Sequence, residues 1–218
     1  MRRVAAALVA AALLIAANSP DYREFRGVGR DTEGTLVEAQ ATITQPICTF
    51  VSRNSWCAAW VALENGGIPP WNIVQVGYII FPPIWGRQVR YFWAAGDAAS
   101  GRAPYAQDLG PAAPGAHHFR VRVVTTDVHG RTYDRVQLYI DGRLVATSPI
   151  SVTPWLEVVN SASWQCELAV HGDRCAVTFS KARIRVEGGY SVAAFRGWVG
   201  YRERGLAITS TTSLRVFR

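Results

Sequence analysis

The chain is short of lysine and lacks the familiar signatures of catalysis. Lys181 is the only lysine among its 218 residues, so arginine carries almost all of the positive charge. The sequence has no Gly-x-Ser-x-Gly elbow, no His-Glu-x-x-His pair, no phosphate-binding loop and no dinucleotide fingerprint. None of the four histidines has a nucleophile close by in the sequence that would mark a serine or cysteine hydrolase. The sequence therefore gives no sign of the common hydrolase and nucleotide-binding classes.

Long apolar runs are also lacking after the first residues. Arg2 and Arg3 precede the run 4–17, which contains only Ala, Val, Leu and Ile. This run has the length of a signal-peptide core and is too short to span a bilayer comfortably. We expect residues 1–17 to be a signal peptide, and 18–218 to be one secreted, soluble, monomeric domain without a membrane partner. An uncleaved anchor or a buried helix is the alternative interpretation of the run.

The four cysteines form an even set, which in an exported protein predicts disulfides. Three pairings are compatible with the sequence. We favour the local pairs Cys48–Cys57 and Cys166–Cys175, because each pair encloses a short loop of hairpin size. A zinc site is the weaker alternative, since there is no Cys-x-x-Cys and His171 does not fit a usual ligand spacing.

The net charge of +7 comes from 23 basic and 16 acidic residues, and loss of Arg2 and Arg3 would leave 21 − 16 = +5. The arginines stand at alternating positions, as in Arg120 and Arg122 or Arg183 and Arg185. A nucleic-acid interface more often has a clustered basic patch with interleaved aromatics. We therefore expect a solvated sheet face and no nucleic-acid partner, while non-specific attraction to an anionic cell envelope remains open.

Alternation with a period of two recurs along the chain, and Gly, Pro and Asp separate the alternating segments. One example is 118–123, with apolar and basic residues on opposite faces. Val136, Leu138 and Ile140 alternate in the same way up to Asp141-Gly142, a strong hairpin signal. Further strands are expected near 36–43, 57–63, 73–80, 89–93 and 176–186, a surface loop at 110–115, and no assignment is made for 191–218. The pattern predicts an all-β sandwich of two antiparallel sheets.

Ligands for a metal or a cofactor are not apparent. The acidic residues Asp97, Asp108 and Asp127 are isolated in the sequence, whereas a calcium site needs clustered oxygen ligands. We therefore expect neither a metal nor a cofactor.

Tryptophan is abundant, with eight residues. Flat indoles on a concave sheet can stack on sugar rings or line a peptide groove, although core packing is the usual role of any single tryptophan. The candidates for contact with a substrate are Trp60, Trp71, Trp85 and Trp93. Trp71 follows Pro70 and Trp85 lies two residues after Pro83, so these two are the better candidates for an exposed position.

Five short motifs occur in an order that resembles the eqolisins, or glutamic peptidases. The motifs are 37–46, 59–66, 73–78, 155–159 and 176–182. The resemblance covers about 27–186. It implies a concanavalin A-like jelly-roll sandwich and an acid endopeptidase acting on polypeptides.

In that family a glutamine and a glutamate on the concave sheet carry the chemistry. The resemblance places these roles on Gln75, in an apolar-Gln-x-Gly segment, and on Glu157. A carboxylate can take a proton from the attacking water, and an amide can stabilise the oxyanion.

The sequence departs from the family pattern at Ile79, where an acidic residue is typical, and at Val158, where a tryptophan is typical. It is also basic, whereas the family is acidic, and it leaves little room for a propeptide. The alternative is a lectin-like module without catalysis that binds polysaccharide or the cell envelope. A structural protein of the envelope is a third option.

Overall fold

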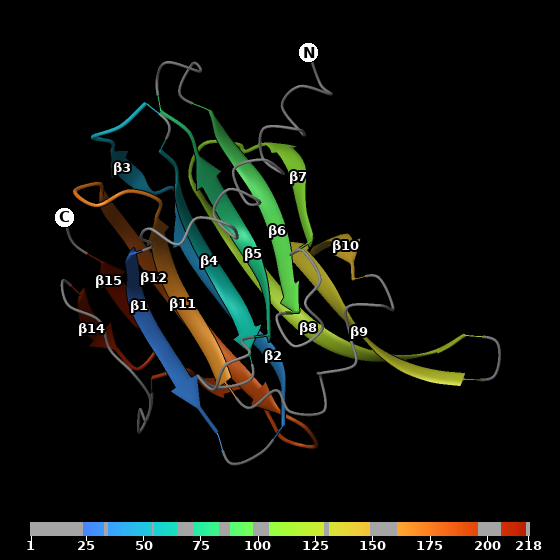
Figure 1. Ribbon diagram of the computed structural model, residues 1–218. Helices are drawn as coiled ribbons and strands as arrows, with labels where there is room; N and C mark the ends of the chain where they lie inside the picture. The colour runs from blue at the N-terminus through green and yellow to red at the C-terminus, as the bar shows by residue number, and fades with distance from the viewer. Residues whose placement is uncertain are drawn as a thin grey trace.

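The computed structural model describes residues 24–32, 35–53, 55–64, 72–82, 88–97, 105–128, 131–148, 161–195 and 206–216 (Figure 1). All regular elements in these ranges are β-strands, which confirms the all-β prediction. No helix in the described ranges has the length and hydropathy needed to cross a bilayer. The expected signal peptide, 1–17, lies outside the described residues.

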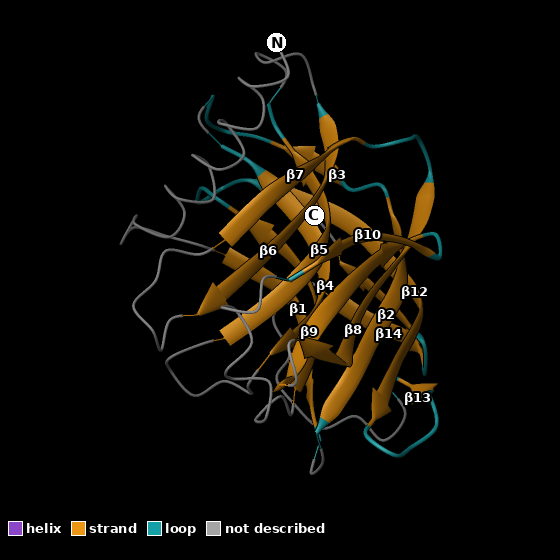
Figure 2. Cartoon of the chain, turned by 90° about the vertical axis from the view of Figure 1, so that its right-hand side faces the viewer, coloured by secondary structure: helices purple, strands orange, loops and turns teal. Residues whose placement is uncertain are grey.

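Two antiparallel sheets form the two layers seen in Figure 2. The first sheet has six strands. In spatial order they are β1 (Glu24–Asp31), β11 (Ser161–Leu168), β4 (Cys57–Glu64), β5 (Asn72–Ile80), β6 (Val89–Asp97) and β7 (Tyr105–Pro111). This sheet is nearer the viewer in Figure 1. Gln75 on β5 and Trp60 on β4, two residues predicted for the site, belong to this sheet.

The second sheet has nine strands and lies behind the first in Figure 1. Its main path is β10 (Arg143–Thr147), β9 (Arg131–Ile140), β8 (Ala116–Val128), β2 (Leu36–Thr44), β12 (Arg174–Val186), β15 (Ser213–Val216) and β14 (Leu206–Ser210). Two short strands, β3 (Ile47–Thr49) and β13 (Val192–Ala193), also pair with β12. The architecture is therefore the predicted sandwich.

The main core lies between the sheets and follows from the period of two. Val136, Leu138 and Ile140 of β9 are buried in it, as predicted, with exposed fractions of 0, 0 and 8%. Arg120 and Arg122 of the paired strand β8 stand on the opposite, outer face, between the inward-facing Phe119, Val121 and Val123. The predicted register of this hairpin is therefore confirmed.

The Asp141-Gly142 turn joins β9 to β10 as the sequence predicts. Both residues have positive φ, 51° for Asp141 and 78° for Gly142. A tight primed turn needs this conformation at both central positions, and Asp-Gly tolerates it well.

Both predicted disulfides are present, Cys48–Cys57 and Cys166–Cys175. The first joins β3 to β4 and the second joins β11 to β12, so each connects an element paired in one sheet to a strand of the other. The sulfur atoms of Cys57 and Cys166 lie 3.7 Å apart, so the two links are in contact. Each is worth on the order of 2–3 kcal/mol in the chain-entropy model.

Several strands were not predicted from the sequence. These are β1, β3, β7, β11 and the three strands after residue 191. The predicted loop 110–115 is a loop only from Ala112, because Pro111 still belongs to β7. Pro111 ends that edge strand, where the missing N–H of proline costs nothing.

Candidate active site

The outer face of the six-stranded sheet carries a second apolar cluster, separate from the main core. Its buried members are Trp56, Ala58, Trp60, Ala62, Ile79, Phe92 and Ala94. An outward sheet face is usually polar and solvated in a two-layer sandwich. Here most side chains described on the middle strands of that face are buried, and Glu64, Ile73 and Arg90 are half-buried, which marks it as a largely water-poor surface.

A row of polar side chains crosses this face on β11. All eight residues of the strand are buried, although four of them are polar: Ser161, Ser163, Gln165 and Glu167. These four, which we call the polar row, alternate with Ala162, Trp164, Cys166 and Leu168, which belong to the main core. The hydroxyl groups of Ser161 and Ser163 have no hydrogen-bond partner among the described residues. The polar row therefore presents hydrogen-bonding atoms inside an apolar surface.

Glu167 is the carboxylate of the polar row and is only 4% exposed. The indole N–H of Trp60 donates a hydrogen bond to its Oε2 at 3.4 Å. A carboxylate out of water is costly unless donors surround it, so a buried, oriented Glu167 is a chemically unusual group on this sheet.

Gln75 lies on β5, on the same face, and is 6% exposed. Its register partners are Ala62 on β4 and Ala94 on β6, whose small side chains leave space around the amide. Gly77, two residues further, lies opposite Trp60. A Cβ at Gly77 would come within 2.7 Å of the Trp60 Cα and still closer to the Ala59 carbonyl oxygen, so only glycine allows this approach.

The register fixes how Gln75 and Glu167 are related. Gln75 aligns with Ala62 and Ser163, whereas Glu167 aligns with Ala58 and Ile79. The two positions are thus two strands apart and four residues out of step, with Trp60 midway. In a flat sheet this corresponds to about 16 Å between Cα atoms, and both side chains project from the same face of the sheet.

The other residues predicted for the site fall into two groups. Glu157, Trp71 and Trp85 lie outside the described residues. Trp93 points into the main core rather than to the outer face, and its indole donates to Gln107 Oε1 at 2.9 Å. Trp60 and Gln75 are thus the predicted residues that the structure brings to the face with the polar row.

The polar row was not predicted from the sequence to be part of a site. Its signal is strict alternation of Ser161, Ser163, Gln165 and Glu167 with apolar residues, a pattern that ordinarily predicts a solvated face. Whether such a face is buried depends on the rest of the fold, which a local pattern does not contain.

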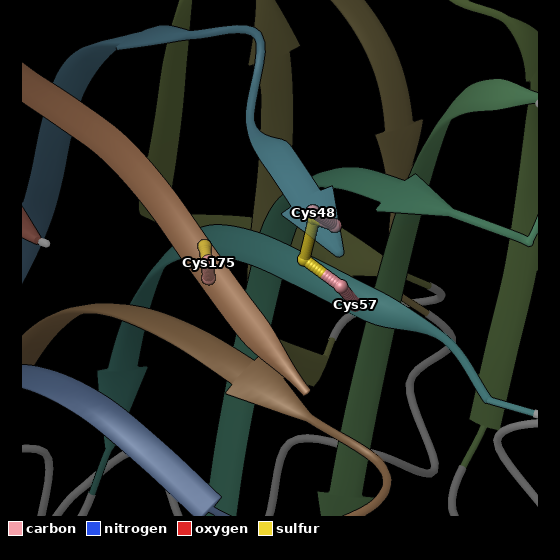
Figure 3. A group of neighbouring side chains, drawn as sticks. All are labelled: Cys48, Cys57 and Cys175. Carbon is pink, nitrogen blue, oxygen red and sulfur yellow. A yellow bond between two sulfur atoms is a disulfide. The ribbon is translucent and has the colours of Figure 1, made fainter. Parts of the chain in front are cut away.

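A sulfur cluster is the one group of described side chains close enough to hold a metal ion. The sulfurs of Cys48, Cys57 and Cys175 lie within 4.8 Å of one another (Figure 3). All belong to disulfides, and no cysteine is free. Because the thiolate is the metal ligand, the oxidised cluster offers no zinc site.

A second polar cluster lies at the β8–β9 end of the sandwich. Asp141 accepts hydrogen bonds from the His117 ring (2.5 Å) and from the His118 backbone N–H (2.8 Å). Burial raises the pKa of Asp141, but these hydrogen bonds outweigh it and hold the pKa below its ordinary value. Burial also raises the pKa of Tyr78, whose hydroxyl donates to the Gly115 carbonyl. None of these groups lies on the face of Gln75: Tyr78 belongs to the main core, and Asp141 stands in the turn between β9 and β10.

Comparisons with known proteins point to one fold. No family model matches the sequence, and no curated protein matches it. Among solved structures, the chain is similar to scytalido-glutamic peptidase, solved with a peptide-based transition-state analog, with a TM-score of 0.57 at 12% identity. It is also similar to SCP-B of the eqolisin family, solved with the tripeptide Ala-Ile-His, with a TM-score of 0.52 at 12% identity. Each match covers 89% of this chain and 98% of the other. The chain has the β-sandwich fold of the eqolisin peptidases.

Proposed function

We propose that the chain is a glutamic-type endopeptidase that cleaves polypeptides on the outer face of the six-stranded sheet. Support comes from the fold, shared over 89% of the chain with peptidases that were solved with peptide-like ligands. The single observation that carries the proposal is the pair of buried groups on one face, the Gln75 amide and the Glu167 carboxylate held by Trp60.

Glu167 suits the role of general base. Ionised, it would take a proton from a water while the water oxygen attacks the carbonyl carbon of the scissile peptide. The proton then passes to the departing amine nitrogen as the C–N bond breaks, which restores the carboxylate. Donation from Trp60 fixes the carboxylate in position between these steps.

Gln75 suits the role of oxyanion donor. Its amide N–H₂ can hydrogen-bond the carbonyl oxygen as negative charge develops there. The separation set by the register requires the peptide to lie over Trp60, between the two groups. The indole would then form the floor of the site, which agrees with the substrate-contacting role predicted for Trp60 from the sequence.

Glu157 is the carboxylate that the family resemblance favours, and two matched substitutions distinguish it from Glu167. Cleavage of an unfolded protein is followed from pH 2 to 7 by mass spectrometry, using the wild type, E167Q and E157Q. We expect E167Q to abolish cleavage and E157Q to retain it. Loss in E157Q alone would make Glu157 the base and rule out Glu167.

Gln75→Ala completes the experiment. It should lower the rate by about 10²–10³, the usual effect of losing one oxyanion donor. Circular dichroism and the thermal midpoint of each variant control for folding. A wild type that cleaves nothing over the whole pH range overturns the peptidase proposal, and a screen of sugar ligands would then test the predicted lectin-like alternative.

A further inference from the structure

The outer face of the nine-stranded sheet concentrates the positive charge of the chain. The outward positions of β8, β9, β12 and β15 carry cationic side chains at Arg120, Arg122, Arg135, Lys181, Arg183, Arg185 and Arg215. We call this surface the arginine face. Between β8 and β12 the only carboxylate among the described residues is Glu38.

The register turns arginines that are distant in the sequence into a regular array. Arg122 and Arg185 flank Glu38 of β2 on its two sides. Arg120 and Arg183 flank Gln40 in the next row. Rows two residues apart are separated by about 6.7 Å along the strands, and β8 and β12 by about 9.6 Å across β2. Arginines that alternate along separate segments of the sequence therefore form a two-dimensional array of guanidinium groups on the folded sheet.

Little on this face neutralises the array. Glu38 Oε2 lies 4.0 Å from Arg122 Nε and 3.7 Å from the terminal nitrogen of Arg185, so one carboxylate faces two cations. Arg183 donates to the Ser191 side chain and backbone carbonyl, which carry no charge. Arg120 stacks on the Tyr139 ring at 4.0 Å. The array keeps a large net positive charge.

Several donors of the array have no acceptor. The Nε–H groups of Arg120, Arg122 and Arg185 are buried and lack hydrogen-bond partners among the described residues. Buried donors are normally satisfied, so these unpaired Nε–H groups are unusual. The Arg122 and Arg185 side chains are 39% and 32% exposed, so an anion would be bound by their outer nitrogens and not by the buried Nε–H. Guanidinium is the group best suited to bind carboxylate or sulfate with two parallel hydrogen bonds.

The residues between the arginines indicate which anionic polymer fits. Gln40 and Thr42 of β2 lie on this face between β8 and β12, and Ser180 of β12 lies beside Thr42. The His118 ring of β8 is hydrogen-bonded to the Gln40 and Thr42 side chains. Amides, hydroxyls and an imidazole suit the hydroxyl groups of sugars. Single-stranded nucleic acid would need open aromatic rings for its bases, but Arg120 covers the Tyr139 ring. A membrane surface would need apolar side chains among the cations, and Gln40, Thr42 and Ser180 are polar.

We propose that the arginine face binds an acidic polysaccharide, with carboxylate or sulfate groups on its sugars. Binding there is independent of the peptidase proposal, because this face is on the opposite side of the sandwich from Gln75 and Glu167. The proposed ligand would hold the protein on an anionic matrix without contacting the face that carries Gln75 and Glu167.

The test uses polygalacturonate and heparin as carboxylated and sulfated probes, and dextran as the neutral control, in calorimetric titrations at two salt concentrations. The variant R120Q/R183Q removes one row of the array without leaving Glu38 unpaired. The matched control R53Q/R143Q removes the same charge from two exposed arginines outside the array. Arg53 follows β3, and Arg143 pairs with Ile140, whose side chain faces the core. We expect R120Q/R183Q to weaken binding of one or both acidic probes by roughly tenfold, with a smaller salt dependence, and R53Q/R143Q to change it less than twofold.

Equal weakening by the two double variants would overturn the proposal, since binding would then follow net charge alone. Tighter binding of a single-stranded oligonucleotide or of anionic vesicles than of both polysaccharides would also overturn it. Failure here leaves the cleavage experiment unaffected, because its variants and its readout are different.

Discussion

The two outer faces of the sandwich are built by the same alternation and have opposite characters. On the six-stranded sheet the outward side chains are buried, and Trp60, Gln75 and Glu167 lie among alanines and other apolar groups. On the nine-stranded sheet the outward side chains are arginines that reach water, with Arg122 39% exposed. Alternation therefore specifies a strand with two faces, but the neighbours of that strand decide whether the second face is a site or a solvated surface.

The largest loss of stability should follow from adding a side chain at Gly77, where β5 approaches β4 closely on the buried face. Gly77→Ala places a Cβ against the Ala59 carbonyl and the Trp60 Cα, so the backbone of β4 or β5 must move. We expect a loss of about 3 kcal/mol in the free energy of unfolding, measured by chemical denaturation. Gly96→Ala is the control, because its nearest contact would be Ile73 Cγ2 at 3.5 Å, an ordinary distance. Similar stability of the two variants would contradict the close packing of β4 against β5.

Much of this fold could be predicted from the sequence, because its signals are local. Asp141-Gly142 specifies its turn through backbone conformation, and alternation at Val136, Leu138 and Ile140 specifies which side faces the core. The two disulfides follow from short spacing in sequence. Each of these depends on a few neighbouring residues.

The sites were harder to predict, because they depend on register between distant strands. Glu167 and Gln75 are far apart in sequence and meet on one face only through β4. Arg120 and Arg183 form one row only because both align with Gln40. Pairing between remote strands is set by the whole sheet, so a single sequence read locally does not show it.

Removing the carboxylate of Glu38 from the arginine face should change stability and polysaccharide affinity moderately. Glu38→Gln leaves Arg122 and Arg185 without the negative charge between them. We expect the free energy of unfolding to fall by about 1 kcal/mol, and the affinity for acidic polysaccharide to rise. Glu187→Gln, at an exposed turn, is the charge-matched control. A Glu38 variant that binds the acidic probes no better than this control would show that Glu38 does not limit the charge of the face.

The smallest change in stability should come from substituting Asp141, at the margin of the arginine face. Asp141→Asn keeps a residue that tolerates positive φ, so it removes charge without disturbing the turn. The pKa of Asp141 is lowered in the folded state, so its contribution is present above the ordinary pKa and is lost as the pH falls through the folded value. We expect the variant to be about 0.5 kcal/mol less stable at pH 7, because the side chain is largely exposed.

The same pair is compared by thermal unfolding at acidic pH to isolate the charge. Below the folded pKa of Asp141 the wild type is protonated, and its stability should converge with that of the variant. A difference that persists unchanged at pH 2 would mean that the carboxylate charge is not responsible.

The two disulfides have a consequence for the response of this chain to proteolysis. They enclose the loops 49–56 and 167–174, where Val51, Arg53 and His171 are exposed and thus accessible to a peptidase. A single cut inside either loop would open the backbone, yet the two fragments would remain joined through sulfur. Asp173 also links the second loop to the first, since it accepts hydrogen bonds from the Val51 N–H and the Ser55 hydroxyl. A chain nicked there would keep its sheets aligned, and its fragments would separate on a gel only after reduction.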